Sequence, residues 1–450
     1  MMSRPWVWIW LLGSALCVGV FSYWGVWLPL HSTGYDFTGP YEAAYALAHH
    51  ARLQVYDVAM QRVFNEQVLR LPDGPSDFRW TPPSAALLIP LGLLPYPVAR
   101  IVWWIMSLAA LLASLWLLAR SVATSAQRLG RSMPMWAATL LLFGAAACAQ
   151  PITDSLRLGQ STTFLLLGFA MLVYGEVHHR PGLSGVGLAI AILDKLFPGI
   201  LLVYFLWRGN YRLVLVTLAI LAALIVVTLP MTGIAMYGAF VQALRTYSNQ
   251  PNAGPVNLSL YHALIVVFGA LVQRGAGEPT SGIIPALALL VCVASFGALL
   301  LAQGMPDIVR RRLSPQPDAQ SDTRPTTMPL FAVSWAVCSM LLVEPIVWIF
   351  YYVLLLVSLA WLLTMVVTHG AAGNDRLKGW WLVGLMGYLI ATLVFPLDPR
   401  IAAPMSSAYI LGICARPLGL ALVWFAHAAY FRRGSLARRS SMLLSVPLDG

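Results

Sequence analysis

Charged residues are scarce in this chain, and their scarcity excludes a soluble globular protein. Asp, Glu, Lys and Arg make up 10% of the 450 residues, whereas hydrophobic residues make up 59%. Apolar runs close to the roughly 20 residues that cross a bilayer as a helix recur from end to end. These runs lack the polar–apolar alternation of barrel strands. The composition therefore predicts an all-α polytopic integral membrane protein.

Metal-binding and nucleotide-binding patterns are absent as well. The five cysteines all lie inside apolar runs without a C-x-x-C pair, so we interpret them as small core residues. No His/Glu or Cys/His spacing indicates a metal site, and no P-loop or G-x-G-x-x-G lies between a strand and a helix. We therefore expect neither a metal ion nor another cofactor.

The basic residues indicate the topology. They gather in short loops and in the tail, as expected for the cytoplasmic side of a membrane protein. The net charge of +11 therefore indicates a lipid bilayer as partner and does not indicate nucleic acid. The first apolar run, Trp6–Leu30, is long and lacks an obvious cleavage site, which predicts an uncleaved first helix. We expect a multi-pass cell-membrane protein with both termini cytoplasmic.

The apolar runs divide the chain into six segments. We expect a first transmembrane helix at 1–30, an extracytoplasmic loop at 31–80, transmembrane helices at 81–230, a second extracytoplasmic loop at 231–280, transmembrane helices at 281–431 and a cytoplasmic basic tail at 432–450. Three short amphipathic helices are predicted in the loops, at Tyr41–Arg52, Val58–Leu71 and Leu258–Val272. The helix count stays open around 81–120, 182–207 and 258–272.

Few acidic residues lie at membrane depth or at outer helix ends: Asp36, Asp154, Asp194, Glu344 and Asp398. Such residues cost a few kcal/mol each, so a function usually requires them. Asp36 follows the first helix directly, and a carboxylate there suits a general base that takes a proton from an attacking hydroxyl. The alternative is that Asp36 caps a helix starting at Gly39 or Pro40.

Two cations are candidates for holding a phosphate. Arg79 lies where the chain re-enters the membrane and can pair with a phosphate through two parallel hydrogen bonds, although interfacial anchoring is the alternative. Lys195 is one of only two lysines among 28 basic residues, and it lies mid-run between Asp194 and Pro198. A phosphate contact and a local Asp–Lys charge balance both explain it.

Three further polar or aromatic groups are candidate substrate contacts. Gln160, in the segment Gly159-Gln160-Ser161, opens a span that could offer helix N-terminal amides to an anion, and a simple helix cap is the alternative. Asn257 precedes Ser259, a plausible helix cap, and could contact a sugar. Trp348 tops a late span and could stack on a sugar, although interfacial tryptophans are common.

Several short motifs follow one another in the same order as in a known protein family. They are Asp36-Phe37, the small-residue segment Tyr41–Ala48, Val55-Tyr56-Asp57, Trp80-Thr81-Pro82-Pro83, Gly159-Gln160, Lys195 followed by Pro198, Asn257-Leu258-Ser259, and Pro345 followed by Trp348. In this order they resemble glycosyltransferase family 87, polytopic transferases with the C-type (GT-C) fold that use polyprenyl-phosphate sugars. Members include polyprenol-phosphate-mannose-dependent α-mannosyltransferases.

The resemblance implies a GT-C-like fold of about 10–13 transmembrane or re-entrant helices, with Asp36 as base in an outward-facing site. Many members have a serine before the late proline and one or two histidines after the tryptophan. This chain has Glu344 and then Phe350-Tyr351-Tyr352 at those places. We add Tyr351 to the candidate substrate contacts, and expect the sugar contacts to differ from those of other members.

We expect an inverting transferase that moves a hexose, mannose first and a pentose such as arabinose second, from a polyprenyl monophosphate to an extracytoplasmic glycan or glycolipid. A monophosphate donor has little need of a divalent metal. Two alternatives stay open: a multi-pass lipid or solute transporter, and a non-catalytic membrane assembly protein. A transporter would step its polar residues through the bilayer, whereas an enzyme would gather Asp36, Arg79, Gln160 and Lys195 at one face.

Overall fold

The described part of the chain is built from helices and contains no strand. A computed structural model describes residues 13, 15–51, 55–71, 78–248, 256–272, 283–302, 329–369, 375–393 and 406–444. Most of the run Trp6–Leu30 is included, whereas Asp398 and the basic segment 310–312 lie outside the described residues. The predicted all-α class is confirmed.

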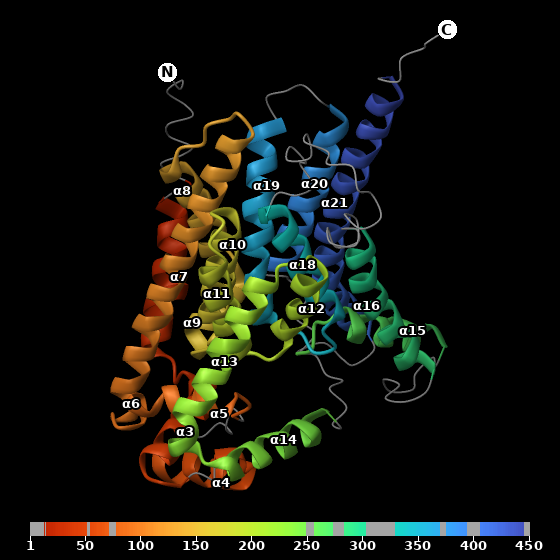
Figure 1. The fold of residues 1–450 in the computed structure, drawn as a ribbon. Coiled ribbons are helices and arrows are strands. Elements are labelled where there is room, and N and C mark those ends of the chain that lie inside the picture. Colours follow the sequence, from red (N-terminus) through yellow and green to blue (C-terminus); the bar gives the residue numbers. More distant parts are fainter. Residues whose placement is uncertain are drawn as a thin grey trace.

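Helices of membrane-crossing length and composition form the upper body in Figure 1. In the described part of the chain, four are long enough alone: α7 (Tyr96–Arg128), α13 (Tyr211–Thr232), the continuous segment Ile349–Thr368, and Ser407–Arg432 within α21 (Ser407–Leu444). A bent pair, α8 (Met135–Ala147) and α9 (Gln150–Leu158), turns by 68° at its break. The segment Gln150–Leu158, which lies within the predicted transmembrane block 81–230, is therefore a helix that turns away from the direction of α8.

Shorter apolar helices complete the body. They are the first helix Ala15–His31, α10 (Thr162–Val177), α11 (Pro181–Asp194), η5 (Phe197–Gly199) with α12 (Ile200–Trp207), α16 (Ile283–Ala302), α18 (Pro329–Val343) and α20 (Asp375–Thr392). The described residues thus confirm an all-α polytopic membrane protein, with four or five helices of spanning length, whereas the count of about 10–13 transmembrane or re-entrant helices stays a prediction. The run 182–207 breaks after Asp194, as its Asp-Lys and proline residues predict.

Small helices form a cap at the lower end of the body in Figure 1. The cap contains η2 (Tyr35–Phe37), α3 (Thr38–Ala48), α4 (Val58–Phe64) continued by η4 (Asn65–Leu69), α5 (Pro82–Leu87), α6 (Ile89–Gly92) and α14 (Ile234–Ser248). The block 81–120 is therefore two short helices followed by one long span. The helix α14 was not anticipated, whereas α15 (Leu260–Val272) falls where an amphipathic piece was expected.

Helix α3, which covers most of the predicted amphipathic helix Tyr41–Arg52, is buried within the protein. Helix α3 buries nine of its eleven residues, because its alanines and glycine let other backbones approach. A Cβ built on Gly92 of α6 would lie 2.3 Å from the backbone carbon of Ala44. The helix α15 is likewise not a separate surface piece, since it packs against α16 and α21.

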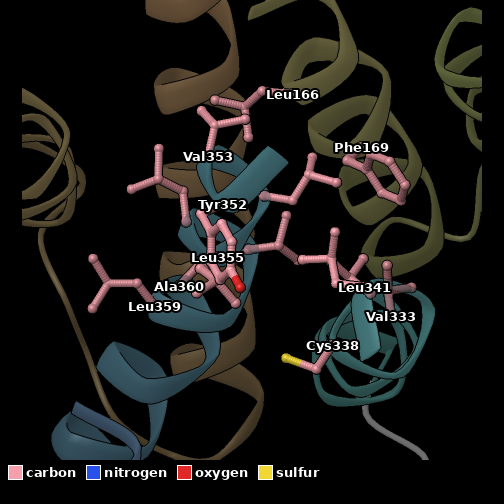
Figure 2. Close-up of a cluster of buried hydrophobic side chains, with 14 of the residues drawn as sticks. Leu166, Phe169, Val333, Cys338, Leu341, Tyr352, Val353, Leu355, Leu359 and Ala360 are labelled. Carbon is pink, nitrogen blue, oxygen red and sulfur yellow. The ribbon is translucent and has the colours of Figure 1, made fainter. Parts of the chain in front are cut away.

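The core lies where α10, α18 and the segment η8 (Ile349–Leu354) with α19 (Leu355–His369) meet. Figure 2 shows side chains from these elements pointing toward one another, among them Phe169, Leu341 and Val353. The buried Tyr352 hydroxyl donates to the Leu258 carbonyl at 2.7 Å, which ties this core to the start of α15. Close packing of this kind holds helices together in lipid, where burial of apolar surface alone does little.

Helices α10 and α11 approach through glycine. A Cβ built on Gly187 would lie 2.4 Å from the carbonyl oxygen of Gly168, whereas one built on Gly182 of the same helix meets nothing within 4 Å. We expect Gly187→Ala to lower stability by about 1–3 kcal/mol because it forces two backbones apart. Thermal unfolding in detergent should show a lower Tm, with Gly182→Ala at or above wild type. An unchanged Tm for Gly187→Ala would contradict the close approach.

Candidate functional site

Asp36 lies in a tight turn between the first helix and the cap. Gly34 has a left-handed backbone (φ 65°), and Tyr35–Phe37 then form one 3₁₀ turn that leads into α3. The N-cap of α3 is Phe37, whose side chain cannot cap the helix. Asp36 therefore lies one residue before the N-cap position of α3, and its carboxylate is half-buried.

The segment leading to this turn is held from α7. Arg100 donates hydrogen bonds to the carbonyls of Pro29 and Ser32, at the open end of the first helix. The Tyr96 hydroxyl donates to the Thr33 carbonyl at 2.6 Å. An arginine and a tyrosine of one long helix thus satisfy carbonyls that have no partner within the first helix. The position of the Asp36 turn relative to α7 is fixed.

Lys195 lies at the break between α11 and η5. Helix α11 ends at Asp194, and Lys195 is extended (φ −142°, ψ 138°), so its side chain leaves the helix axis. Its Nζ lies 5.3 Å from the ring centroid of Trp80 and 5.9 Å from that of Tyr351. Aromatic faces attract an ammonium and leave its N–H groups able to donate to an anion.

Charges from three parts of the chain meet at this amine. The Lys195 ammonium interacts electrostatically with Asp194, Asp36 and Arg79, the first two attracting it and the last repelling it. Asp194 is buried, its Oδ2 has no hydrogen-bond partner, and the Ser161 hydroxyl lies beside it. Asp36, Arg79 and Lys195, far apart in sequence, therefore share one cluster, and Asp194 joins them.

Short hydrogen bonds hold the Arg79 segment against α11. The Ser84 hydroxyl of α5 donates to the Leu193 carbonyl at 2.7 Å and lies 2.8 Å from the Thr81 hydroxyl. The Tyr56 hydroxyl donates to the Trp80 carbonyl at 2.7 Å. Thus α5 docks on the end of α11, which explains why Trp80 reaches the Lys195 amine.

Gln160 lies beside the Asp36 turn. Its neighbour Gly159 ends α9 with a left-handed backbone (φ 77°), and a Cβ there would lie 2.7 Å from Cβ of Phe37. The Trp103 indole donates to the Gly159 carbonyl at 2.8 Å and stacks on Phe37. Only glycine fits this position, so the motif Gly159-Gln160 is required by packing as well as by any contact with substrate.

Asn257 holds a loop. Its side-chain nitrogen donates to the Pro345 carbonyl at 3.0 Å, and its side-chain oxygen accepts from the Val347 amide at 3.1 Å. The Ser259 hydroxyl also donates to the Pro345 carbonyl and accepts from the His262 amide, as expected of a helix cap. The structure therefore gives Asn257 a role in placing Trp348, alongside the sugar contact predicted for it.

The residues around Trp348 differ in their surroundings. Tyr351 packs against Phe197 of η5, with ring centroids 4.9 Å apart, and so lies beside Lys195. Trp348 is half-buried and begins η8. Burial raises the pKa of the Glu344 carboxyl to about 7. Glu344 is therefore an acid whose charge changes near neutral pH, unlike the serine of many family members.

The buried cation Arg416 was not among the residues predicted from the sequence. Arg416 of α21 is only 4% exposed and donates to the carbonyl of Ala391 and to the side-chain oxygen of Gln150. An arginine inside the apolar run Ser406–Tyr430 was the available signal, because ionisable residues inside spans are costly.

The candidate residues gather at one end of the body. The elements that carry them contact each other in turn: α9 with η2 and η8, and α11 with α5 and η5. Among the described residues, no three His, Cys, Asp or Glu side chains are grouped to hold a metal ion. A set of polar residues at one end fits an active site better than the trans-bilayer trail expected of a transporter.

Comparisons with known proteins bear on the family of this chain. A model of glycosyltransferase family 87 matches residues 78–314, more than half of the chain. Two relatives are similar over 72% of it: a protein of Mycolicibacterium smegmatis, 27% identical over 335 residues, and one of Mycobacterium tuberculosis, 23% identical over 325 residues. Both are named polyprenol-phosphate-mannose-dependent alpha-(1-2)-phosphatidylinositol pentamannoside mannosyltransferases.

The matches have defined limits. They cover 68% and 65% of the two relatives, so the chain spans about two thirds of their lengths. The family match includes Arg79, Gln160, Lys195 and Asn257, whereas Asp36 lies before it. No solved structure gives a significant match. The match over more than half of the chain, together with the apolar helices, shows that this polytopic, GT-C-like membrane protein belongs to glycosyltransferase family 87.

Proposed function

We propose that this transferase is an inverting enzyme that moves mannose from a polyprenyl-phosphate donor to an extracytoplasmic glycan or glycolipid. The observation that supports it best is the cluster around Lys195, whose ammonium lies within the electrostatic reach of the Asp36 carboxylate and of the Arg79 guanidinium. Inverting transfer needs this combination, because a base and a phosphate-binding group must act at opposite ends of one reaction.

The proposed step balances without a metal ion. Asp36 takes the proton from an acceptor hydroxyl while that oxygen forms a bond to the anomeric carbon of the sugar. The bond from the anomeric carbon to the phosphate oxygen breaks, and its electron pair leaves with the polyprenyl phosphate. Lys195 and Arg79 stabilise the charge that develops on this phosphate. Asp36 then loses its proton to water.

The remaining candidates have narrower roles in this proposal. Trp80 and Tyr351 bracket the lysine amine, so the donor phosphate would sit against aromatic surface. Gln160 and Trp348 would contact the sugar, and Asn257 would place the loop that carries Trp348. The cap would face the extracytoplasmic side, with both termini cytoplasmic, so that the lipid chain of the donor enters between helices from the outer leaflet.

Donor choice provides the test. The names of the relatives lead us to expect that purified protein consumes polyprenyl-phosphate-mannose when a phosphatidylinositol mannoside is supplied. Polyprenyl-phosphate-arabinose should react more slowly, and the product should carry the mannose with its anomeric configuration inverted. Radiolabelled sugar and NMR of the product provide the measurement. Retention of configuration would contradict the single-displacement step, and consumption of neither donor would contradict the function.

A further inference from the structure

A chain of hydrogen-bonded side chains links the last span to helix α9. Arg416 donates to the carbonyls of Ala391 and Leu393, at the end of α20. Its second terminal nitrogen also donates to the side-chain oxygen of Gln150, the first residue of α9. One guanidinium thus satisfies open carbonyls of one helix and holds the start of another.

The chain continues along one face of α9. The Gln150 side-chain nitrogen donates to Asp154 Oδ2 at 3.1 Å, and Asp154 Oδ1 lies 3.3 Å from Arg157 Nη2. Asp154 is buried, so its charge is neutralised by these neighbours and not by water. The four side chains, Arg416, Gln150, Asp154 and Arg157, come from two helices, and each contacts the next.

The far end of α9 touches the Asp36 turn. The carbonyl of Arg157 accepts a hydrogen bond from the Ser32 hydroxyl at 2.7 Å. Two residues later, Gly159 packs against Phe37, the residue after Asp36. Because α9 leaves the line of α8 at 68°, its angle is not fixed by a straight helix. Its two ends are fixed by Arg416 and by the Asp36 turn.

We propose that Arg416 is a positioning residue: it sets the place of α9 through Gln150 and Asp154, and α9 in turn places Asp36 against the phosphate-binding cations. The part of this proposal that concerns sugar transfer rests on the proposed function. The part that concerns α9 does not. A shift of about 1 Å in a reacting group can cost about 100-fold in rate, so loosening α9 should lower kcat more than it raises KM.

Two variants separate positioning from simple support of α20. Gln150→Met removes the hydrogen bond between Arg416 and α9 and leaves Arg416 bonded to the carbonyls at the end of α20. Arg416→Met removes both the bond to α9 and the bonds to these carbonyls. Hydrogen exchange of the α9 amides, with α10 as internal reference, reports the helix directly. We expect both variants to speed α9 exchange about tenfold and to lower kcat by about 10- to 100-fold, with the donor KM changed less than about threefold.

The double variant completes the test. Gln150→Met also breaks the hydrogen bond between Gln150 and Asp154. If Arg416 acts on α9 through Gln150, the two changes together should therefore have no more effect on α9 exchange or kcat than Gln150→Met alone. Wild-type exchange and kcat in Gln150→Met, or fully additive effects, would overturn the proposal. Faster exchange with unchanged kcat would overturn its link to Asp36. If the wild-type protein transferred no sugar, the exchange data would still decide the role of Arg416.

Discussion

Replacing Asp36 by asparagine is expected to lower kcat for sugar transfer by about 10²- to 10⁴-fold, the usual contribution of a positioned general base. Asparagine keeps the size and polarity of the side chain but cannot accept the proton of the acceptor hydroxyl. Asp36 is half-buried and does not occupy the N-cap position of α3, and asparagine has nearly the same shape, so the change should leave the fold intact. Steady-state transfer with purified protein and a fixed donor gives kcat, and thermal unfolding checks the fold.

Two other aspartates sharpen this experiment. Asp57 is exposed and caps α4 by accepting from the amides of Ala59 and Met60, a role that asparagine also performs, so Asp57→Asn should transfer sugar at the wild-type rate. Asp194 shares the Lys195 cation with Asp36, so Asp194→Asn tests the assignment of the base. Near-wild-type turnover in Asp36→Asn, together with loss in Asp194→Asn, would move the base to Asp194.

Hydrophobic patterning was sufficient for the fold class, because lipid forces every spanning segment into a helix. It was insufficient for the cap. The segment around α3 has an amphipathic pattern, yet α3 is buried, because its partners come from α5 and α6. The turn of α9 away from α8 also escaped prediction, since proline at Pro151 and polar residues indicate a break without indicating its angle.

Some residues of the candidate site could likewise be predicted from the sequence, and others could not. Rare residues in costly places, Asp36 and Lys195, were visible in the sequence, and the structure brings them together. Residues that act through side-chain hydrogen bonds were not visible. Asn257 was predicted to contact a sugar. Its hydrogen bonds to the backbone of residues 345–347 could not be predicted, because that segment is distant in sequence. Arg416 was overlooked because its partner Gln150 is far away in the sequence.

Removing the lysine charge is expected to have the second large effect. Lys195→Met keeps an unbranched side chain between Trp80 and Tyr351 but removes the ammonium proposed to hold the leaving phosphate. Loss of one group that stabilises developing negative charge typically costs about 10²- to 10³-fold in rate. We therefore expect kcat/KM for the donor to fall by that amount, with the larger share in kcat. Initial rates over a range of donor concentrations provide the measurement.

A further variant distinguishes two roles of Lys195: binding the donor phosphate, or only balancing the charge of Asp194. Lys195→Arg retains the positive charge with a different geometry, so it should recover part of the lost rate if a phosphate is bound there. Arg120→Met is the matched control, because it removes an exposed cation that lies 5.2 Å from the Trp116 ring, outside the proposed site. Lys195→Met that transfers sugar as fast as Arg120→Met would show that the lysine only offsets its neighbouring carboxylate, and the donor phosphate would then need another partner.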